Sequence, residues 1–160
     1  MDIAKHFIEI HTDYFVCDRR RTVSLQEKGK RYEAINVDSK QIAQYHTDDP
    51  DRKTESKRCD YAIYIFEKDQ NGKIKADDRL IFIELKGSDV DRAIEQINSS
   101  LEERVINGRV NISKVDARVI TSKTPSPKYH SSKKVALRNK LNQYGKGCLI
   151  VKTRTFSENV

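Results

Sequence analysis

The sequence predicts a single mixed α/β domain spanning residues 1–160, with a sheet of about five strands flanked by helices. Three patterns favour this class. Residues 59–66 and 79–85 are nearly continuous apolar runs, as in strands that are covered on both faces. Residues 88–101 place apolar side chains at helical spacing. Helix and strand patterns then alternate to residue 156, which favours a mixed sheet packed against helices.

The first 57 residues predict one helix and a hairpin. Residues 3–15 carry apolar side chains at spacings of four, three and four, namely Ile3, Phe7, Ile10 and Tyr14. Residues 16–31 are polar and irregular, which predicts a loop. Residues 32–37 and 41–46 alternate in polarity around a short polar link, which predicts a hairpin. The polar residues 47–57 predict a second loop.

Two central strands follow, at residues 59–66 and 79–85. Asn71-Gly72 is a turn signal between them. Asp77 and Asp78 lie in this connection, where we expect solvated loop residues. Tyr61 and Tyr64 lie within the first strand, where core packing is a simpler expectation than a stacking role.

The second half predicts helix, strand, helix and strand. Ser88 is the expected N-cap of the first helix, and its apolar face is Val90, Ile94, Ile97 and Leu101. Residues 117–121 read as a strand. Residues 133–144 form a helix with apolar positions at Val135, Leu137 and Leu141. Gly145 is expected to end that helix, and residues 148–156 form the last strand.

Charged residues lie at the ends of the two central strands. Side chains alternate along a strand, so Glu84 and Lys86 share one face. Asp60 begins the preceding strand. A two-residue turn at Asn71-Gly72 would place Asp60 opposite Ile83, whereas an odd-length loop or one bulge would place it opposite Glu84. The sequence permits either register, and a structural ion pair at a sheet edge is the alternative explanation of these charges.

A meeting of Asp60 and Glu84 would place two carboxylates within reach of one hard cation. Oxygen ligands of this kind suit Mg²⁺ or Mn²⁺, which keep positions open for water and phosphate. Lys86 on the same face could orient the attacking water and offset charge on the phosphate. Without a cation the two acids would repel each other.

Asp60, then Glu84-Leu85-Lys86 at a strand end, then Gln96 on the following helix, resemble the PD-(D/E)xK nuclease superfamily. Members of that superfamily share the restriction-endonuclease-like fold, whose αβββαβ core is close to the elements predicted for residues 3–121. The resemblance covers the middle third of the chain well and its ends only by topology.

The resemblance implies a metal-dependent nuclease that hydrolyses DNA, in repair, recombination or defence. It implies that Asp60 and Glu84 bind Mg²⁺ (or Mn²⁺), that Lys86 is the catalytic lysine, and that Gln96 helps to hold the site or the nucleic acid. Cys59 stands where a proline often precedes the aspartate, although many branches lack that proline. Several branches carry a further acid, for which Glu9 and Glu33 are the candidates.

The charge balance also favours a polyanionic partner. Net charge is +7 overall, but residues 104–160 carry +11 and residues 1–103 carry −4. Basic side chains in and after the loop that follows residue 121 would contact phosphates without reading sequence. The expected nucleic-acid-binding residues are Lys123, Lys128, Lys133, Lys134, Arg138 and Lys140. A solvated basic surface is the alternative.

Other classes fit the composition less well. No apolar run approaches the roughly 20 residues of a membrane span, and the charged N-terminus does not resemble a signal peptide. Three widely spaced cysteines favour a reducing compartment, the cytoplasm. DNA is the expected partner, RNA is not excluded, and a homodimer would suit two-strand cutting. The competing function is a catalytically inactive subunit of the same fold that binds nucleic acid or recruits a partner.

Overall fold

A computed structural model of the chain describes residues 4–46, 59–85, 87–123 and 131–160. Its elements follow in chain order. They are α1 Phe7–Ile10, β1 Val16–Asp18, β2 Thr22–Glu27, β3 Lys30–Ile35, β4 Gln41–His46, β5 Tyr61–Phe66, β6 Arg79–Glu84, α2 Val90–Leu101, the π-helical turn η1 Glu102–Ile106, β7 Lys114–Thr121, α3 Ser132–Asn142, β8 Leu149–Thr153 and β9 Thr155–Asn159.

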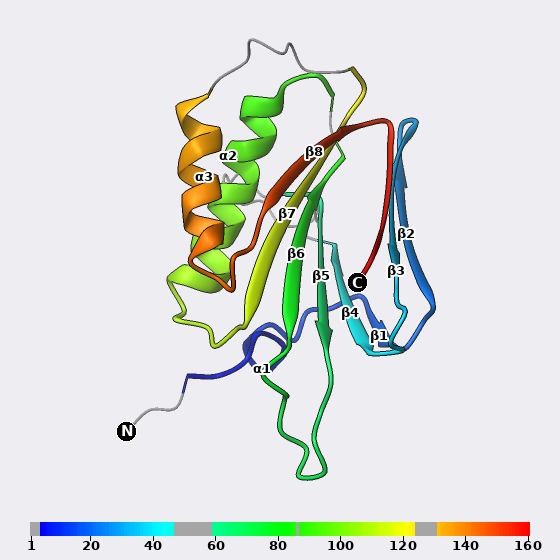
Figure 1. The fold of residues 1–160 in the computed structure, drawn as a ribbon, viewed down its shortest axis with the longest axis vertical. Helices are drawn as coiled ribbons and strands as arrows, with labels where there is room; N and C mark the ends of the chain where they lie inside the picture. The colour runs from blue at the N-terminus through cyan, green and yellow to red at the C-terminus, as the bar shows by residue number, and fades with distance from the viewer. Residues whose placement is uncertain (1–3, 47–58, 86, 124–130) are drawn as a thin grey trace.

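The elements form three layers. A six-stranded sheet in the order β1-β4-β5-β6-β7-β8 lies in the middle. Helices α2 and α3 cover one face, and a three-stranded sheet in the order β2-β3-β9 covers the other (Figure 1). The predicted mixed α/β class is therefore confirmed, whereas the central sheet has six strands in place of about five and the second sheet was not predicted.

Strand direction changes across the central sheet. Strands β1, β4, β5 and β6 pair antiparallel, and β6, β7 and β8 pair parallel. Parallel neighbours need a crossover connection. Helix α2 supplies it between β6 and β7, and α3 supplies it between β7 and β8. In the second sheet β2 and β3 form a hairpin, and β9 adds parallel to β3.

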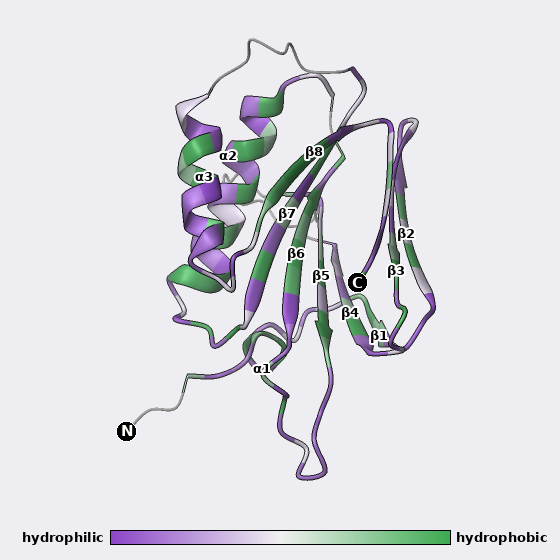
Figure 2. Cartoon of the chain, in the orientation of Figure 1, coloured by the Kyte–Doolittle hydropathy of each residue, from purple (hydrophilic) through white to green (hydrophobic). Residues whose placement is uncertain are grey.

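Burial on both faces explains the continuous apolar runs of β5 and β6. Ala62, Tyr64 and Phe66 pack into the core beneath the helices. Their neighbours Ile63 and Ile65 pack into a separate core beneath the second sheet. The hydropathy colouring shows these strands as mainly apolar along most of their length (Figure 2). The central strands were accordingly predicted well.

The N-terminal helix is much shorter than predicted. Of the described residues 4–15, only Phe7–Ile10 is helical, and His6 makes no side-chain capping bond. Phe7 is fully buried, but Ile10 is 39% and Tyr14 is 42% exposed, so the predicted apolar face is not used as one. Ile3 lies outside the described residues.

The hairpin predicted for residues 32–46 is wrong. Strand β3 belongs to the second sheet and β4 to the central sheet. Asn36, which is buried, fixes the link between them. Its Nδ2 donates to the carbonyls of Arg20 and Lys40 at 3.0 and 2.8 Å, and its Oδ1 accepts from the Lys40 amide at 3.0 Å.

The C-terminal elements also depart in detail from the prediction. Leu137 and Leu141 of α3 are buried, but Val135 is 55% exposed. The single strand expected over residues 148–156 is two strands. Arg154 adopts a left-handed φ of 65° between β8 and β9, and this turn carries the chain from the central sheet to the second one.

Candidate metal-binding active site

The register of β5 and β6 brings Asp60 to Glu84. Tyr61 lies opposite Ile83, so the residue before Tyr61 faces the residue after Ile83. The connection is not a two-residue turn. A bridge joins Lys68 to Ile74 around a longer loop, and the pairing shifts by two residues before β6 begins. Of the two registers that the sequence permitted, the one that joins the acids is present.

Two backbone hydrogen bonds fix the carboxylates of Asp60 and Glu84 in position. The amide of Asp60 donates to Glu84 Oε2 at 3.0 Å, and the amide of Leu85 donates to Asp60 Oδ2 at 3.1 Å. Asp60 is 1% exposed and Glu84 is fully buried. Because strand side chains alternate, both acids lie on the helix-covered face of the sheet.

Gln96 approaches the same end of the sheet from α2. It is 5% exposed, and its Oε1 is buried with no hydrogen-bond partner among the described residues. A hollow of about 330 Å³ adjoins it. The hollow is lined by Gly87, Ser88, Asp89, Arg92, Ala93 and Gln96. A buried, unpartnered amide oxygen is expensive unless a ligand or water satisfies it.

The cap of α2 differs by one residue from the prediction. Asp89, not Ser88, is the N-cap, and its side chain accepts from the Arg92 amide at 3.1 Å. The predicted apolar face is confirmed, since Val90, Ile94, Ile97 and Leu101 are all buried. Ser100 of the same helix accepts from the Cys59 amide at 3.0 Å, which anchors the chain just before Asp60.

The donor set at this end of the sheet fits a hard cation. Carboxylate and amide oxygens are the ligands that Mg²⁺ and Mn²⁺ prefer. Within the described ranges no group of three or more His, Cys, Asp and Glu side chains is arranged to hold a metal ion. Mg²⁺ commonly takes part of its ligands from water and substrate. Lys86, the third predicted catalytic residue, lies outside the described residues.

The two additional acid candidates do not reach this end of the sheet. Glu33 lies in β3 of the second sheet, where it pairs with Arg31. Glu9 is exposed on α1, which lies at the lower end of the sheet in Figure 1, whereas β6 ends at the upper end. Neither is placed to join Asp60 and Glu84.

The predicted nucleic-acid-binding residues divide into two groups. Lys133 forms an ion pair with Glu95 of α2, and Lys140 forms one with Glu102 at the start of η1, so these contacts tie α3 to α2 and to the turn that follows it. In the part of the chain that the structure describes, Lys134 and Arg138 form no ion pair, and Arg138 is exposed.

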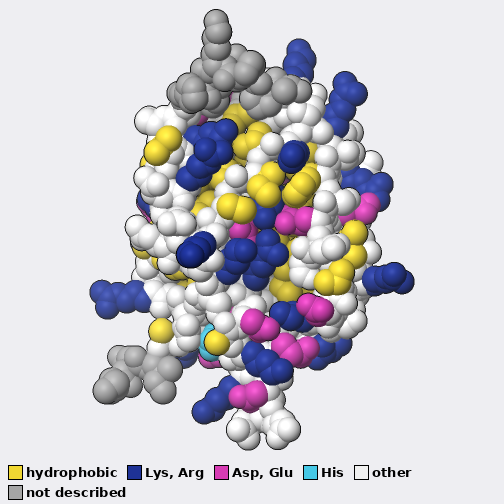
Figure 3. All heavy atoms as spheres, viewed as in Figure 1, with side chains coloured by type: hydrophobic (Ala, Val, Ile, Leu, Met, Phe, Trp, Pro, Cys, Tyr) yellow, Lys and Arg dark blue, Asp and Glu magenta, His cyan; other side chains and the backbone are white. Residues whose placement is uncertain are grey.

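Two predicted residues lie after β7. Lys123 is exposed there, and Lys128 lies outside the described residues. On the face seen in Figure 3, Lys and Arg side chains are spread over several elements and do not form one compact patch.

Asp78 is the clearest polar residue that the sequence misassigned. It is 1% exposed. It accepts from the Tyr64 hydroxyl at 2.5 Å and from the Ser113 hydroxyl at 2.7 Å. Burial and this bond raise the pKa of Tyr64. Asp78 therefore cross-links the base of the central sheet, while Asp77 is a surface residue as expected, paired with Lys40.

A buried ionic network between the two sheets was also not predicted. Arg118 on β7 donates to both carboxylate oxygens of Glu158 on β9, at 2.7 and 3.0 Å. Arg79 donates to Asp116 at 2.7 Å, and Tyr32 donates to Glu158 at 2.9 Å. The sequence of β7 does not indicate this network, because Asp116 and Arg118 interrupt an apolar run as ordinary surface charges would.

No match is found when the chain is compared with protein families, with curated proteins or with solved structures.

The described helices are each too short or too polar to span a bilayer. Cys17, Cys59 and Cys148 form no disulfide bond, which agrees with their wide spacing.

Proposed function

We propose that the chain is a divalent-cation-dependent nuclease that hydrolyses phosphodiester bonds of DNA. The observation that carries the proposal is the apposition of Asp60 and Glu84 at one end of the central sheet, each fixed by a backbone amide. Carboxylate oxygens held next to each other are the ligands that Mg²⁺ and Mn²⁺ prefer. This pair of fixed acids supports a site for a divalent cation.

Asp60 and Glu84 would hold the cation through their carboxylate oxygens. When bound, Mg²⁺ or Mn²⁺ would polarise the phosphate and lower the pKa of the attacking water. The chain's own contribution is positioning. Two backbone hydrogen bonds restrict the carboxylates, and Gln96 of α2 adds an amide to the hollow that includes Gly87, three residues after Glu84. The resemblance assigns Lys86 to orienting the water and offsetting charge on the phosphate.

The order of elements supports the same proposal. Strands β4, β5 and β6 form an antiparallel meander, α2 crosses over one face, and β7 returns parallel to β6. This succession is compatible with the αβββαβ core of the restriction-endonuclease-like fold. The short α1 and the additional sheet of β2, β3 and β9 are departures from that core.

DNA is the proposed substrate because of the resemblance and the basic second half of the chain. Lys134 and Arg138 lie one helical turn apart on α3, so they would face one backbone together. Phosphate contacts of this kind position a nucleic acid without reading its sequence. RNA as substrate is a second outcome of the same cleavage assay.

The test combines metal binding with cleavage. Mn²⁺ at a hundred times its dissociation constant should stabilise the fold by about 2.7 kcal/mol. For a chain of this size that is a rise in Tm of roughly 5–10 °C. Glu84→Gln should abolish both the rise and Mg²⁺-dependent cleavage, while circular dichroism stays unchanged. Lys86→Ala should retain the rise but slow cleavage by roughly 10² or more.

Glu9→Gln is the matched control, since it removes an acid that lies away from the site. It should cleave and bind Mn²⁺ like the unaltered chain. Stabilisation by Mn²⁺ without any cleavage, or nucleic-acid binding with neither, would favour the inactive subunit instead. Cleavage by Glu84→Gln at the unaltered rate would show that the acids are not the site.

A further inference from the structure

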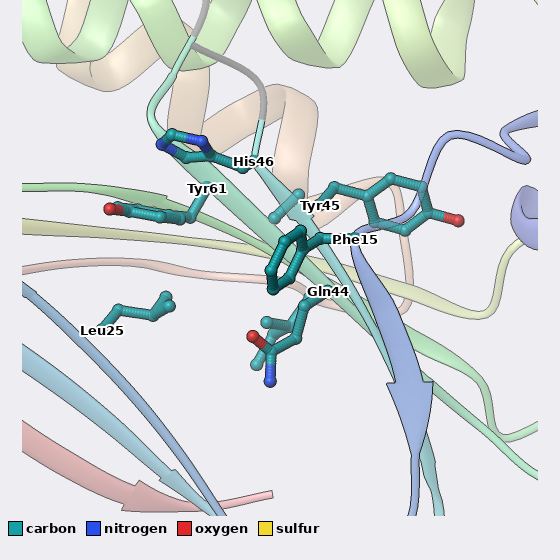
Figure 4. A pocket seen from close by; sticks show the side chains of 8 residues that line it. Phe15, Leu25, Gln44, Tyr45, His46 and Tyr61 are labelled. Atoms are coloured by element: carbon teal, nitrogen blue, oxygen red, sulfur yellow. The ribbon is translucent and has the colours of Figure 1, made fainter. Parts of the chain in front are cut away.

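A second hollow opens beside β4 and β5, on the far side of the sheet from α2. Its volume is about 240 Å³. Figure 4 shows the side chains that line it. Its lining is mostly apolar and aromatic. The lining residues are Phe15, Leu25, Gln44, Tyr45, His46, Tyr61, Ala62 and Ile63. The sequence context of Tyr61 and Tyr64 suggested that both pack in the core. Tyr64 does, whereas Tyr61 is only partly buried and lines this hollow.

The aromatic rings of His46, Tyr61 and Phe15 are among the side chains that line this hollow. His46 and Tyr61 lie opposite each other in the β4–β5 register and stack with centroids 4.8 Å apart and planes 27° apart. Phe15 is 82% exposed. The Phe15 amide donates a hydrogen bond to the Gln44 carbonyl at 2.7 Å, which holds Phe15 beside β4 near the edge of the sheet. Large exposed aromatic surface next to an apolar hollow is typical of a binding site.

The hollow lies at the same end of β5 as the candidate active site. Tyr61 directly follows Asp60, and alternation turns their side chains to opposite faces of the sheet. A chain that passes around this end of β5 could therefore contact the acids with one part and the rings with another. Neither hollow is lined by residues of the other.

We propose that the hollow holds one unpaired base of a single-stranded nucleic acid. The choice of a nucleic acid as ligand rests on the proposed function. The hollow adds to that function a substrate class, namely a nucleic acid with a single-stranded segment beside the bond to be cut. The size agrees, because pockets for larger ligands run from about 300 to 1,000 Å³ and this one suits a single ring system.

The chemistry of the lining agrees as well. Every base has a face that stacks on aromatic side chains, so such a site accepts bases without regard to identity. The Gln44 amide offers both a donor and an acceptor to the edge of a base. The attached phosphates would remain outside the apolar hollow, because charged groups are costly to bury.

The test is binding of a short oligonucleotide that contains one 2-aminopurine, whose fluorescence falls when the base stacks. Divalent cations are removed, so no cleavage occurs. The single strand should be quenched and bound. Phe15→Ala and Tyr61→Leu should each relieve the quenching and weaken affinity roughly tenfold, as expected when a base loses a stacking partner. A fully paired duplex should show little change.

Phe15→Ala keeps the test independent of folding, because so exposed a side chain contributes little to the core. Val37→Ala is the control, since Val37 is a 56% exposed apolar residue outside the hollow. Unchanged quenching and affinity in both ring variants would overturn the proposal. So would a change in sedimentation with Phe15→Ala, since the hollow would then be a contact between copies of this chain.

This result is separable from that for the active site. If the rings govern binding of single strands but no Mg²⁺-dependent cleavage is found, the base-binding hollow stands and the nuclease proposal fails. If the chain cleaves nucleic acid and the ring variants behave like the control, the nuclease proposal stands and the hollow is not a base site.

Discussion

Replacing Arg118 by methionine should lower the free energy of unfolding by about 3–5 kcal/mol, the usual result of removing one partner from a buried ion pair. The Arg118 side chain is 2% exposed and its pair spans both sheets. Besides Glu158, it donates to the carbonyls of Ala117 and Cys148 at 2.9 and 3.0 Å. Methionine fills similar space but leaves the Glu158 carboxylate with less compensation.

At this chain length each kcal/mol corresponds to roughly 2–4 °C in Tm, so the midpoint should fall by about 6–20 °C. Adding Glu158→Gln to Arg118→Met removes the uncompensated charge. The double variant should therefore be more stable than the sum of the single changes predicts, by roughly 0.5–3 kcal/mol.

The assay is urea unfolding followed by circular dichroism, in the unaltered chain, both single variants and the double variant. Arg31→Met is the control, because the Arg31–Glu33 pair is partly exposed and such pairs contribute about 0–1 kcal/mol. A loss under about 1 kcal/mol for Arg118→Met, or strict additivity, would refute the view that this network joins the two sheets.

Two further predictions concern charge. Lys134→Ala combined with Arg138→Ala should shrink the slope of log affinity against log salt on duplex DNA by about two units. Fluorescence anisotropy in Ca²⁺ measures this slope. An unchanged slope would show that α3 faces away from the nucleic acid. Asp116→Asn should remove part of the acid sensitivity of the fold. Burial alone would raise the pKa of Asp116, but the Cys148 amide and the guanidinium groups of Arg79 and Arg118 hold it below its usual range. Its contribution is therefore complete above the ordinary pKa of about 3.9 and is lost as pH falls through the lower folded-state value. Unfolding midpoints between pH 2 and 6 measure this, and parallel curves for Asp116→Asn and the unaltered chain would contradict it.

The elements best predicted from the sequence are those whose burial is strongest. Strands β5 and β6 are buried on both faces, and α2 buries a regular apolar stripe, so each carries its own pattern. The candidate site followed from these elements, since Glu84 and Gln96 lie on β6 and α2 and Asp60 directly precedes β5. The register between Asp60 and Glu84 did not follow, because it depends on a loop whose exact pairing no residue pattern specifies.

The remaining errors have physical causes as well. The residues of β3 and β4 alternate as strands should, but alternation does not say which sheet a strand joins. Strand β2 has the burial pattern of a half-covered strand, with Val23 and Leu25 inward, and its charged flanks concealed that signal. Asp78 looked like a loop residue because buried hydrogen bonds to Tyr64 and Ser113 leave no local trace in the sequence.

The parallel pairing of β9 with β3 has a consequence for the order of folding. Tyr32 and Glu158 are hydrogen-bonded although 126 residues separate them. Contacts this distant along a chain form slowly, because a long loop must close first. During synthesis the β2–β3 hairpin would emerge early and wait, with the β3 edge open, until nearly all the described chain had been made. An open edge of this kind is a template for pairing with other chains. Between synthesis of β3 and arrival of β9, the β3 edge is therefore open to pairing of this kind.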